Sequence, residues 1–336
     1  MSSTTENLTR PTVRGASTGG GTAGAPGTMA VVIPVKNGGE RFRVCLPGWL
    51  GQAGVGEVLV IDSGSTDGSD AFAEAAGATV VRIEPAAFHH ARTRMYGVFL
   101  TRAPFVLMTV QDARPMDRFV AENLRASIDR PVAGVENRAV AAYARHVPEP
   151  GHSLQARLRV WLDPAGSHEP RWHGRGAHAP ALNNVAALYR REALRQTPFP
   201  EVPFAEDAAW ARAVCAAGAY IRFEPAAVVE HSHERPPADS FWRAYADGSF
   251  HARAVHRPGS ALEGLADWAS LLPRTALHIT GDTLAALRLA DGAGTNLDPA
   301  ARARDWAGLV THALATQAGF TLARWDAATG HPNRNP

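Results

Sequence analysis

The stretch Val106-Leu-Met-Thr-Val-Gln-Asp-Ala-Arg-Pro115 joins an uninterrupted apolar run to a carboxylate, Asp112, and a closing proline. Such a run is typical of a central parallel strand that is buried on both faces, whereas a half-exposed strand alternates in polarity. Ligands of open α/β sheets bind beyond the carboxyl ends of the strands, so Asp112 stands where a metal or another ligand would be held. The alternative is that Asp112 caps a helix starting near Met116.

Strands and helices alternate before and after this run. Apolar, β-branched stretches predict strands, and the helix-forming stretches between them predict helices. The alternation predicts an α/β fold with a mostly parallel sheet and helices on both faces. The expected strands are residues 30–35, 57–62, 78–83 and 106–110, and the expected helices are residues 40–50, 67–76, 88–101 and 116–128.

The second half of the chain has a less regular pattern. Residues 148–180 are dense in Pro, Gly, His and Arg, which predicts a long irregular loop over the site, suited to substrate binding. The other expected elements are a strand at 132–136, a helix at 206–217 that ends at Gly218, and short strands at 220–223 and 227–230.

The pattern is helical from Phe241 onward. Apolar residues there recur at spacings of three or four, which predicts an amphipathic helix. They are Leu262, Leu265, Trp268, Leu271 and Leu272. Because the charges of this segment are mixed in sign, we expect it to pack on the main domain rather than to lie on a membrane surface.

Composition limits the domain organisation and the partners. The 336 residues are 45% hydrophobic and 20% charged, which is enough for one large domain with an appendage or for two modest domains. The net charge of +2 gives no overall field that would attract nucleic acid. We expect residues 1–28, rich in Ser, Thr and Gly, to be disordered, residues 29–250 to form the α/β domain and residues 251–336 to form a helical extension.

The cysteines and the hydropathy pattern indicate a compartment. Cys45 and Cys215 form neither a metal motif nor a disulfide framework, which favours the reducing cytoplasm. No stretch of the sequence is apolar for long enough to span a membrane. We therefore expect a cytoplasmic protein whose association with the inner face of the cell membrane, if any, is peripheral.

Acidic residues follow several predicted strands or open predicted helices. Asp62, Asp67, Asp112, Glu206 and Asp207 together outline a crevice lined by carboxylates, although each alone would also suit a helix cap. A ribose or a base needs hydrogen-bond acceptors, and a diphosphate needs a divalent metal that carboxylates hold, so the set predicts a nucleotide site. The sequence has no Gly-x-Gly-x-x-Gly after the first strand and no Walker lysine, which disfavours dinucleotide oxidoreductases and P-loop enzymes.

Basic and histidine side chains complete the candidate set. We expect only one of Arg92 and Arg94 to meet phosphates, because alternate residues on a helix do not share a face. His231 and His233 follow a predicted strand in a His-Ser-His pattern that places both rings on one face, where they would meet a metal or a diphosphate. The alternative for each histidine is a purely structural role.

Six segments of the chain carry a resemblance to a known family. They are Val31-Val-Ile-Pro-Val-Lys-Asn-Gly-Gly39, Val60-Ile-Asp-Ser-Gly-Ser-Thr-Asp-Gly-Ser69, Phe88-His-His-Ala-Arg-Thr-Arg94, Thr109-Val-Gln-Asp-Ala-Arg-Pro115, Pro200-Glu-Val-Pro-Phe-Ala-Glu-Asp-Ala-Ala-Trp210 and Glu224-Pro-Ala-Ala-Val-Val-Glu-His-Ser-His233. In this order they resemble the family 2 glycosyltransferases of the inverting GT-A fold, and within them the bacterial rhamnosyltransferase-like branch. The similarity extends over about residues 29–255.

The resemblance implies a role for each matching residue. The residues implied to meet a nucleotide-sugar donor are Pro34, Asp62, Ser65, Arg94, Gln111 and Asp112. Asp112 and His231 would hold a divalent metal, Mg²⁺ or Mn²⁺. The catalytic acids would be Glu206 and Asp207, with Asp207 as the general base.

The implied reaction is transfer of a sugar, with inversion, from a nucleoside diphosphate to a glycan or lipid-linked glycan in cell-surface polysaccharide biosynthesis. The branch suggests rhamnose or another deoxyhexose as that sugar. Ala91 and Met95 depart from the family pattern, which has Gly and Asn there, and this puts one nucleotide contact in doubt. Two alternatives stay open: a catalytically inactive GT-A module that binds glycan or partners, and a sugar nucleotidyltransferase. The second would carry a Gly-rich, basic loop where this chain has Lys36-Asn-Gly-Gly-Glu40.

Overall fold

The structure is a computed structural model that describes residues 29–131, 139–162, 164–174, 182–203, 205–255, 269–271, 273–277 and 299–329. The chain divides into two units. The first unit comprises residues 1–145, 168–202 and 206–230, and the second comprises residues 146–167, 203–205 and 231–336. All five acids of the predicted crevice therefore belong to the first unit.

A mixed sheet of nine strands, counted within the described ranges, organises the first unit. Its order is β3-β2-β1-β4-β8-β6-β9-β5, and β7 pairs with β9. The strands are β1 (Met29–Val35), β2 (Val55–Asp62), β3 (Thr79–Arg82), β4 (Phe105–Thr109), β5 (Arg114–Pro115), β6 (Ala139–Val147), β7 (Arg171–His173), β8 (Ala186–Arg190) and β9 (Tyr220–Glu230). The pairs among β1 to β4 are parallel, whereas β8 runs antiparallel to β4 and β6, and β9 runs antiparallel to β5 and β7.

Strand β4 lies at the centre of this sheet, between β1 and β8. All five of its residues are buried, as the apolar run predicts. β4 runs parallel to β1 but antiparallel to β8, so the parallel arrangement expected from alternation covers only one half of the sheet. The apolar run predicts that the strand is buried, but it does not predict the direction of the neighbouring strand.

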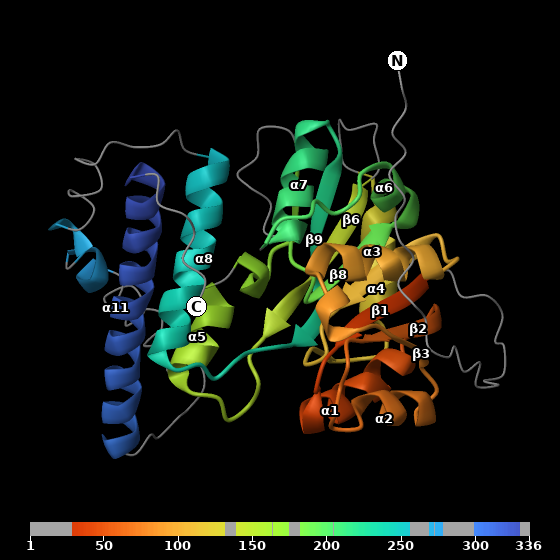
Figure 1. Ribbon diagram of the computed structural model, residues 1–336, viewed down its shortest axis with the longest axis horizontal. Helices are drawn as coiled ribbons and strands as arrows, with labels where there is room; N and C mark the ends of the chain where they lie inside the picture. Colours follow the sequence, from red (N-terminus) through yellow and green to blue (C-terminus); the bar gives the residue numbers. More distant parts are fainter. Residues whose placement is uncertain are drawn as a thin grey trace. The chain divides into compact units, whose positions relative to one another are not determined.

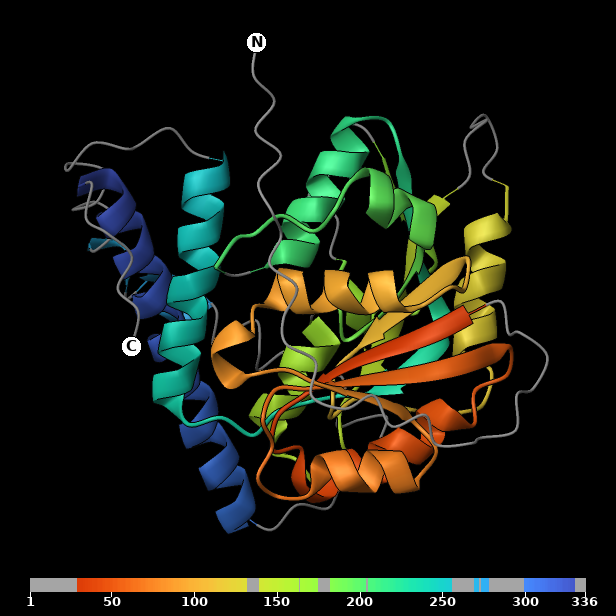
Figure 2. The ribbon, with the colours of Figure 1, turned by 45° about the vertical axis from the view of Figure 1, so that its right-hand side comes forward.

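Helices cover both faces of the sheet (Figures 1 and 2). On one face Val31 and Ile33 of β1 share a buried cluster with Phe42 and Trp49 of α1 and Leu124 of α4. On the other face Val32 meets α3, and Tyr189 of β8 packs edge-on against Trp210 of α7. The helices of the first unit are α1 (Gly39–Leu50), α2 (Ser69–Ala75), α3 (His90–Leu100), α4 (Val120–Asp129), α6 (Arg191–Gln196) and α7 (Glu206–Ala216).

Strand β9 corrects the prediction of two short strands at 220–223 and 227–230. The strand is continuous from Tyr220 to Glu230, and Pro225 lies inside it. β9 pairs with β7 through Ile221–Phe223 and with β5 through Val229 and Glu230, and Pro225 falls between these two paired segments. A proline is tolerated at such a position because neither of these two ladders needs its missing N–H.

The segment 148–180 is more regular than its composition indicates. It contains α5 (Leu154–Leu162), a 3₁₀ turn (Pro164–Gly166) and β7, so the expectation of an irregular loop is wrong for these residues. α5 buries Ala156 and Leu158, and the Ser153 hydroxyl accepts a hydrogen bond from the Ala156 N–H at the helix start. Residues 1–28, the strand expected at 132–136, and Leu262, Leu265, Trp268 and Leu272 of the predicted stripe lie outside the described residues.

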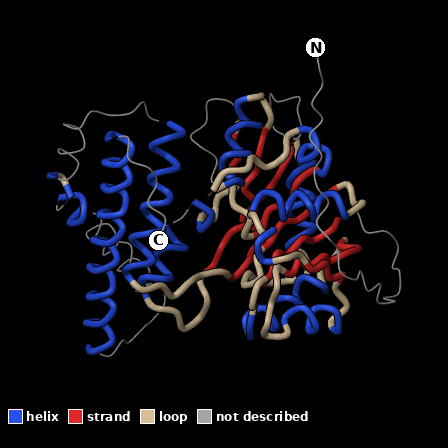
Figure 3. The backbone as a smooth tube through the Cα atoms, viewed as in Figure 1, coloured by secondary structure: helices blue, strands red, loops and turns tan. Residues whose placement is uncertain are grey.

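The described part of the second unit is largely helical (Figure 3). Its long helices α8 (Pro237–Val255) and α11 (Pro299–Thr329) pack closely, because Gly319 leaves room for the α8 backbone. Buried polar pairs fix their register: Ser240 bonds His312 at 2.7 Å, and the Tyr245 hydroxyl donates to Asp326 at 2.9 Å. No helix within the described ranges is both long and apolar enough to cross a membrane.

Gly97 tests the contact between α3 and β1. A Cβ at this position would lie 2.5 Å from Val32 Cγ1 and 3.2 Å from Ile61 Cδ1, both in the middle of the sheet. Gly97→Ala should therefore lower the free energy of unfolding by about 1–3 kcal/mol, the usual cost of overpacking. Gly308→Ala in α11 is the matched control. Nothing lies within 4 Å of its added Cβ, so alanine there should be neutral or stabilise the protein by up to about 1 kcal/mol. Urea unfolding measures both variants, and equal destabilisation would contradict the close approach.

Candidate functional site

Three loops, which follow β1, β2 and β4, are tied together by side chains. The backbone N–H groups of Lys36, Asn37, Gly38 and Gly39 donate, in that order, to Gln111 Oε1 (2.9 Å), Ser65 Oγ (2.9 Å), Ser69 Oγ (3.0 Å) and Asp67 Oδ2 (2.9 Å). A loop that cradles phosphate needs free, convergent N–H groups. Because all four are occupied by side-chain oxygens, the geometry disfavours the phosphate-binding loop that a nucleotidyltransferase would need here.

Asp62 ends β2 with one oxygen engaged and one unengaged. Its Oδ2 accepts hydrogen bonds from the N–H groups of Gly64 and Ser65, each at 3.0 Å. Its Oδ1 is buried and has no hydrogen-bond partner among the described atoms. A buried acceptor without a partner is costly, so this oxygen is a candidate for a ligand contact. Pro34 lies nearby in register, opposite Ile61 of β2.

The loop that carries Asp112 is fixed from the end of β9. Glu230 is buried and accepts from Arg41 Nη2 at 3.0 Å and from Arg114 Nη2 at 2.8 Å. Arg41 Nε also donates to the Asp112 carbonyl oxygen at 3.3 Å. Helix α4 starts at Val120, and Phe119, not Asp112, is its N-cap residue, so Asp112 does not cap this helix.

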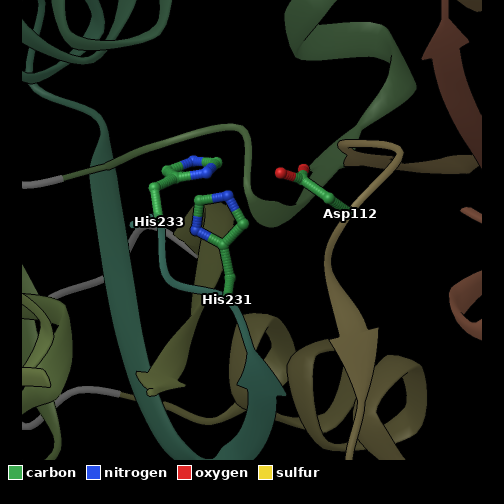
Figure 4. Close-up of side chains that lie close together, drawn as sticks. All are labelled: Asp112, His231 and His233. Carbon is green, nitrogen blue, oxygen red and sulfur yellow. The ribbon is translucent and has the colours of Figure 1, made fainter. Parts of the chain in front are cut away.

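His231 directly follows Glu230, whose partner in the β5–β9 ladder is Arg114. Asp112, His231 and His233 each offer one ligand atom, and these atoms all lie within 4.8 Å of one another. Figure 4 shows the Asp112 carboxylate directed toward the two imidazole rings, whose centroids are 4.5 Å apart. One carboxylate and two imidazoles suit a divalent first-row metal and leave coordination positions for water or phosphate oxygens. The set therefore fits a metal site, with His233 as a third possible ligand.

Arg94 forms a buried ion pair. Its Nη1 lies 2.6 Å from Glu206 Oε1, both side chains are about 7% exposed, and the same Nη1 lies 3.3 Å from His90 Nδ1. Arg92, by contrast, is exposed, and it forms a looser ion pair, of 3.6 Å, with the exposed Glu201. The two arginines thus point in different directions, as their spacing predicts, and Arg94 is the one that belongs to the acidic cluster.

Asp207 is held at the start of α7 by backbone groups. Its Oδ2 accepts from the Asn184 N–H and its Oδ1 from the Ala208 N–H, each at 2.8 Å. Ala205, just before the helix, has a φ of 57°, a left-handed conformation that costs a non-glycine residue energy and often marks functional sites. Burial and the neighbouring Glu206 charge raise the pKa of Asp207 to about 6, against the opposing effect of Arg94.

The sequence interpretation missed two groups of residues that shape the site. Glu230 forms ion pairs with Arg41 and Arg114. In the sequence, this residue was marked only by its place as an acid at the end of an apolar strand. Asn184 contacts both catalytic candidates, because its Nδ2 donates to Glu206 at 3.1 Å and its N–H donates to Asp207. In a sequence, an asparagine before a strand is usually interpreted as a turn residue, so only the structure shows this contact.

Residues 30–197, half of the chain, match the family described as Glycosyl transferase family 2. The chain belongs to this family. It is therefore a glycosyltransferase, and the resemblance inferred from the six segments is confirmed. Glu206, Asp207 and His231 lie beyond the matched range, so the roles expected for them rest on the geometry above.

Two relatives and one solved structure are similar to this family 2 protein. The O-antigen chain rhamnosyltransferases RfbN of Salmonella typhimurium (strain LT2) and WbaN of Salmonella anatum are each 27% identical to it, over 67% of this chain and 72% of theirs. The mannosyltransferase PcManGT from Pyrobaculum calidifontis, solved in complex with GDP-Man and Mn2+, superposes with a TM-score of 0.57. It is 21% identical, over 91% of this chain and 87% of that one. The superposition confirms the GT-A-like fold.

The buried ion pair predicts unequal effects for the two arginines of α3. Arg94→Ala leaves the Glu206 charge buried without its main partner, which should cost about 3–5 kcal/mol of unfolding free energy. Arg92→Ala removes only an exposed, loose pair and should change stability by less than about 1 kcal/mol. Denaturant unfolding of the two variants, made in the same helix two residues apart, measures the difference. A similar small loss in both would show that the Arg94 pair is not desolvated.

Proposed function

We propose that this glycosyltransferase moves a sugar from a nucleoside diphosphate to an acceptor hydroxyl with inversion, and that Asp207 is the general base. The observation that carries the proposal is the Asp207 carboxylate, fixed by two backbone N–H groups and raised in pKa to about 6. A base with a pKa just below neutrality is ionised at pH 7 and still has a high proton affinity. Glu206 suits the role less well, because its carboxylate is paired with Arg94.

The proposed reaction is a single displacement. The acceptor oxygen forms a bond to the anomeric carbon while the bond from that carbon to the diphosphate oxygen breaks. The hydroxyl proton passes to a carboxylate oxygen of Asp207, and the nucleoside diphosphate leaves. Because Oδ1 and Oδ2 each accept one backbone N–H, each retains a lone pair for this proton.

The donor would bind at the loops that follow β1, β2 and β4. Asp62 Oδ1 would accept a hydrogen bond from the ribose or the base, which satisfies its buried lone pair. Pro34, Ser65 and Gln111 belong to the same set of strand ends, where Ser65 and Gln111 already fix the loop of Lys36. Arg94 would act at the donor side by holding Glu206 beside the reacting sugar rather than by a free guanidinium.

A divalent metal would be held by Asp112 and His231, with His233 as a further ligand. The two imidazoles favour Mn²⁺ over Mg²⁺, which prefers oxygen ligands alone. When bound, such an ion supplies positive charge that neutralises the leaving diphosphate. The Mn2+ in the similar mannosyltransferase complex supports this assignment.

A deoxyhexose such as rhamnose is the proposed sugar, and a glycan or lipid-linked glycan is the proposed acceptor. The two O-antigen chain rhamnosyltransferases support rhamnose as the sugar and a glycan as the acceptor through their sequence similarity. A lipid-linked acceptor would bring the protein to the inner face of the membrane, where it would associate peripherally. The decisive first experiment is a thermal-shift screen of nucleoside diphosphate sugars with and without Mn²⁺ or Mg²⁺. Stabilisation by none of them would favour the inactive binding module instead.

Asp112→Asn should weaken metal-supported donor binding. The change removes a charged metal ligand, so donor affinity in Mn²⁺ should fall by about 1–3 kcal/mol, whereas affinity in EDTA should not change. Isothermal calorimetry with the donor or its nucleoside diphosphate measures both conditions. Asp117→Asn, at an exposed position in the same segment, is the control and should bind like the unaltered protein. Equal affinity of the unaltered protein with and without metal would refute the metal role.

Asp207→Asn should lower the turnover of glycosyl transfer by at least ~10² with donor affinity nearly intact, because an amide can hold the hydroxyl but cannot take its proton. In the unaltered protein the turnover should fall tenfold per pH unit below about 6, where Asp207 gains a proton, and level off above that. Asp239→Asn, an exposed acid in the first turn of α8, is the control and should keep full turnover. Near-normal turnover of Asp207→Asn would transfer the role to Glu206.

A further inference from the structure

We propose that Tyr189 and Asn184 form a positioning pair that holds the Glu206 side chain and thereby sets the environment of the base Asp207. The proposal rests on the function proposed above and adds two residues that no sequence motif indicated. Neither residue would touch the substrate. Their role would be to keep two adjacent acids in different surroundings.

The contacts of Asn184 fix the orientation of its amide. The Tyr189 hydroxyl donates to Asn184 Oδ1 at 2.8 Å, so the opposite end of the amide, Nδ2, faces Glu206 Oε1 at 3.1 Å. A hydroxyl can donate to the carbonyl oxygen, whereas a carboxylate can only accept, so the two partners together exclude the flipped amide. Asn184 is 3% exposed and Tyr189 is fully buried, which prevents water from replacing either bond.

One residue therefore contacts both acids through different groups. The Asn184 side chain donates to Glu206, and its backbone N–H donates to Asp207 Oδ2 at 2.8 Å. Movement of Asn184 would therefore remove one hydrogen-bond donor from each carboxylate. Tyr189 is itself fixed by edge-on packing against Phe199 and Trp210, so the pair is anchored in the aromatic core between β8 and α7.

The charged and titratable groups around Asp207 come from three elements. Glu206 adjoins it on α7, Arg94 and His90 lie on α3, and Tyr189 lies on β8. The Glu206 charge raises the pKa of Asp207, and Arg94 lowers it. Without the Asn184 donor, the Glu206 carboxylate would be held by Arg94 alone and could turn away from Asp207, so its charge would raise the pKa of Asp207 less. The base would then be weaker and less well oriented.

Tyr189→Phe tests the pair, and Tyr143→Phe is its matched control. Both tyrosines are fully buried and bonded through the hydroxyl, Tyr143 to His173 Nε2 at 3.0 Å, away from the acids. Tyr189→Phe should lower kcat about tenfold at pH 7.5, the effect of one buried hydrogen bond, with the donor KM unchanged. The acid limb of its pH–rate profile should move to lower pH. Tyr143→Phe should leave kcat and the profile as in the unaltered protein.

A second measurement needs no activity. The pKa of Asp207 is raised on folding, so its contribution to stability is present below its unfolded pKa and is lost as the pH rises toward about 6. Asp207→Asn should remove that part of the pH dependence of the melting temperature between pH 4 and 7. This effect of Asp207→Asn on the pH dependence of the melting temperature should be smaller when Tyr189→Phe is also present. It should be unchanged when Tyr143→Phe is also present. Asn184→Ala, which keeps the backbone N–H to Asp207, should act like Tyr189→Phe and serves if that variant does not fold.

The outcomes separate the two proposals. If Tyr189→Phe matches Tyr143→Phe in both measurements, the positioning pair is refuted, whatever the activity. If the unaltered protein transfers no sugar but the melting data follow the expected pattern, the proposed function fails and the influence of Tyr189 on Asp207 stands. If kcat falls while the acid limb and the pH dependence of melting stay unchanged, Tyr189 does not act through the environment of Asp207, and the inference is refuted.

Discussion

The buried ion pair between Arg94 and Glu206 is the constraint on which the site depends. α3 packs on the parallel strands β1 and β2, whereas α7 packs on the antiparallel strand β9, so the pair joins helices that belong to the two halves of the sheet. A buried charge pair persists only when further hydrogen bonds compensate desolvation. His90 and Asn184 supply them. Asp207 is the next residue, and the Asn184 that bonds Glu206 through its side chain also donates its backbone N–H to the Asp207 carboxylate.

Electrostatic surroundings give the two neighbouring acids different chemistry. Glu206 Oε1 meets a guanidinium and an amide donor, which satisfy its charge. Among the described residues, Asp207 is held by backbone N–H groups in a poorly solvated place, and burial and the Glu206 charge raise its pKa. A buried carboxylate with a raised pKa is a typical candidate for a general base. The sequence Glu-Asp alone contains no information on which of the two is which.

Hydrophobicity and the alternation of elements along the chain predicted the parallel half of the sheet. The apolar run before Asp112 predicted the buried strand β4, and alternation predicted the parallel half of the sheet, because burial on both faces leaves no polar positions in a strand. The continuity of β9 through Pro225 depends on which strands pair beside it, and α5 was hidden because its glycine- and proline-rich flanks dominated the composition of the segment. Asn184 was missed for a related reason: the two acids that it contacts lie more than twenty residues away along the chain.

The two departures from the family pattern are explained by how α3 divides its faces. Ala91 and Met95, four residues apart, are both buried, so they lie on the side of the helix that packs into the unit. Arg94 points from the same helix toward Glu206, and Arg92 points to solvent. A methionine at a buried position is a packing choice, since its flexible apolar chain fills an irregular space. Under the proposed function, donor recognition would therefore depend on the polar groups of the neighbouring strand ends, above all on Asp62 Oδ1, which has no hydrogen-bond partner among the described atoms.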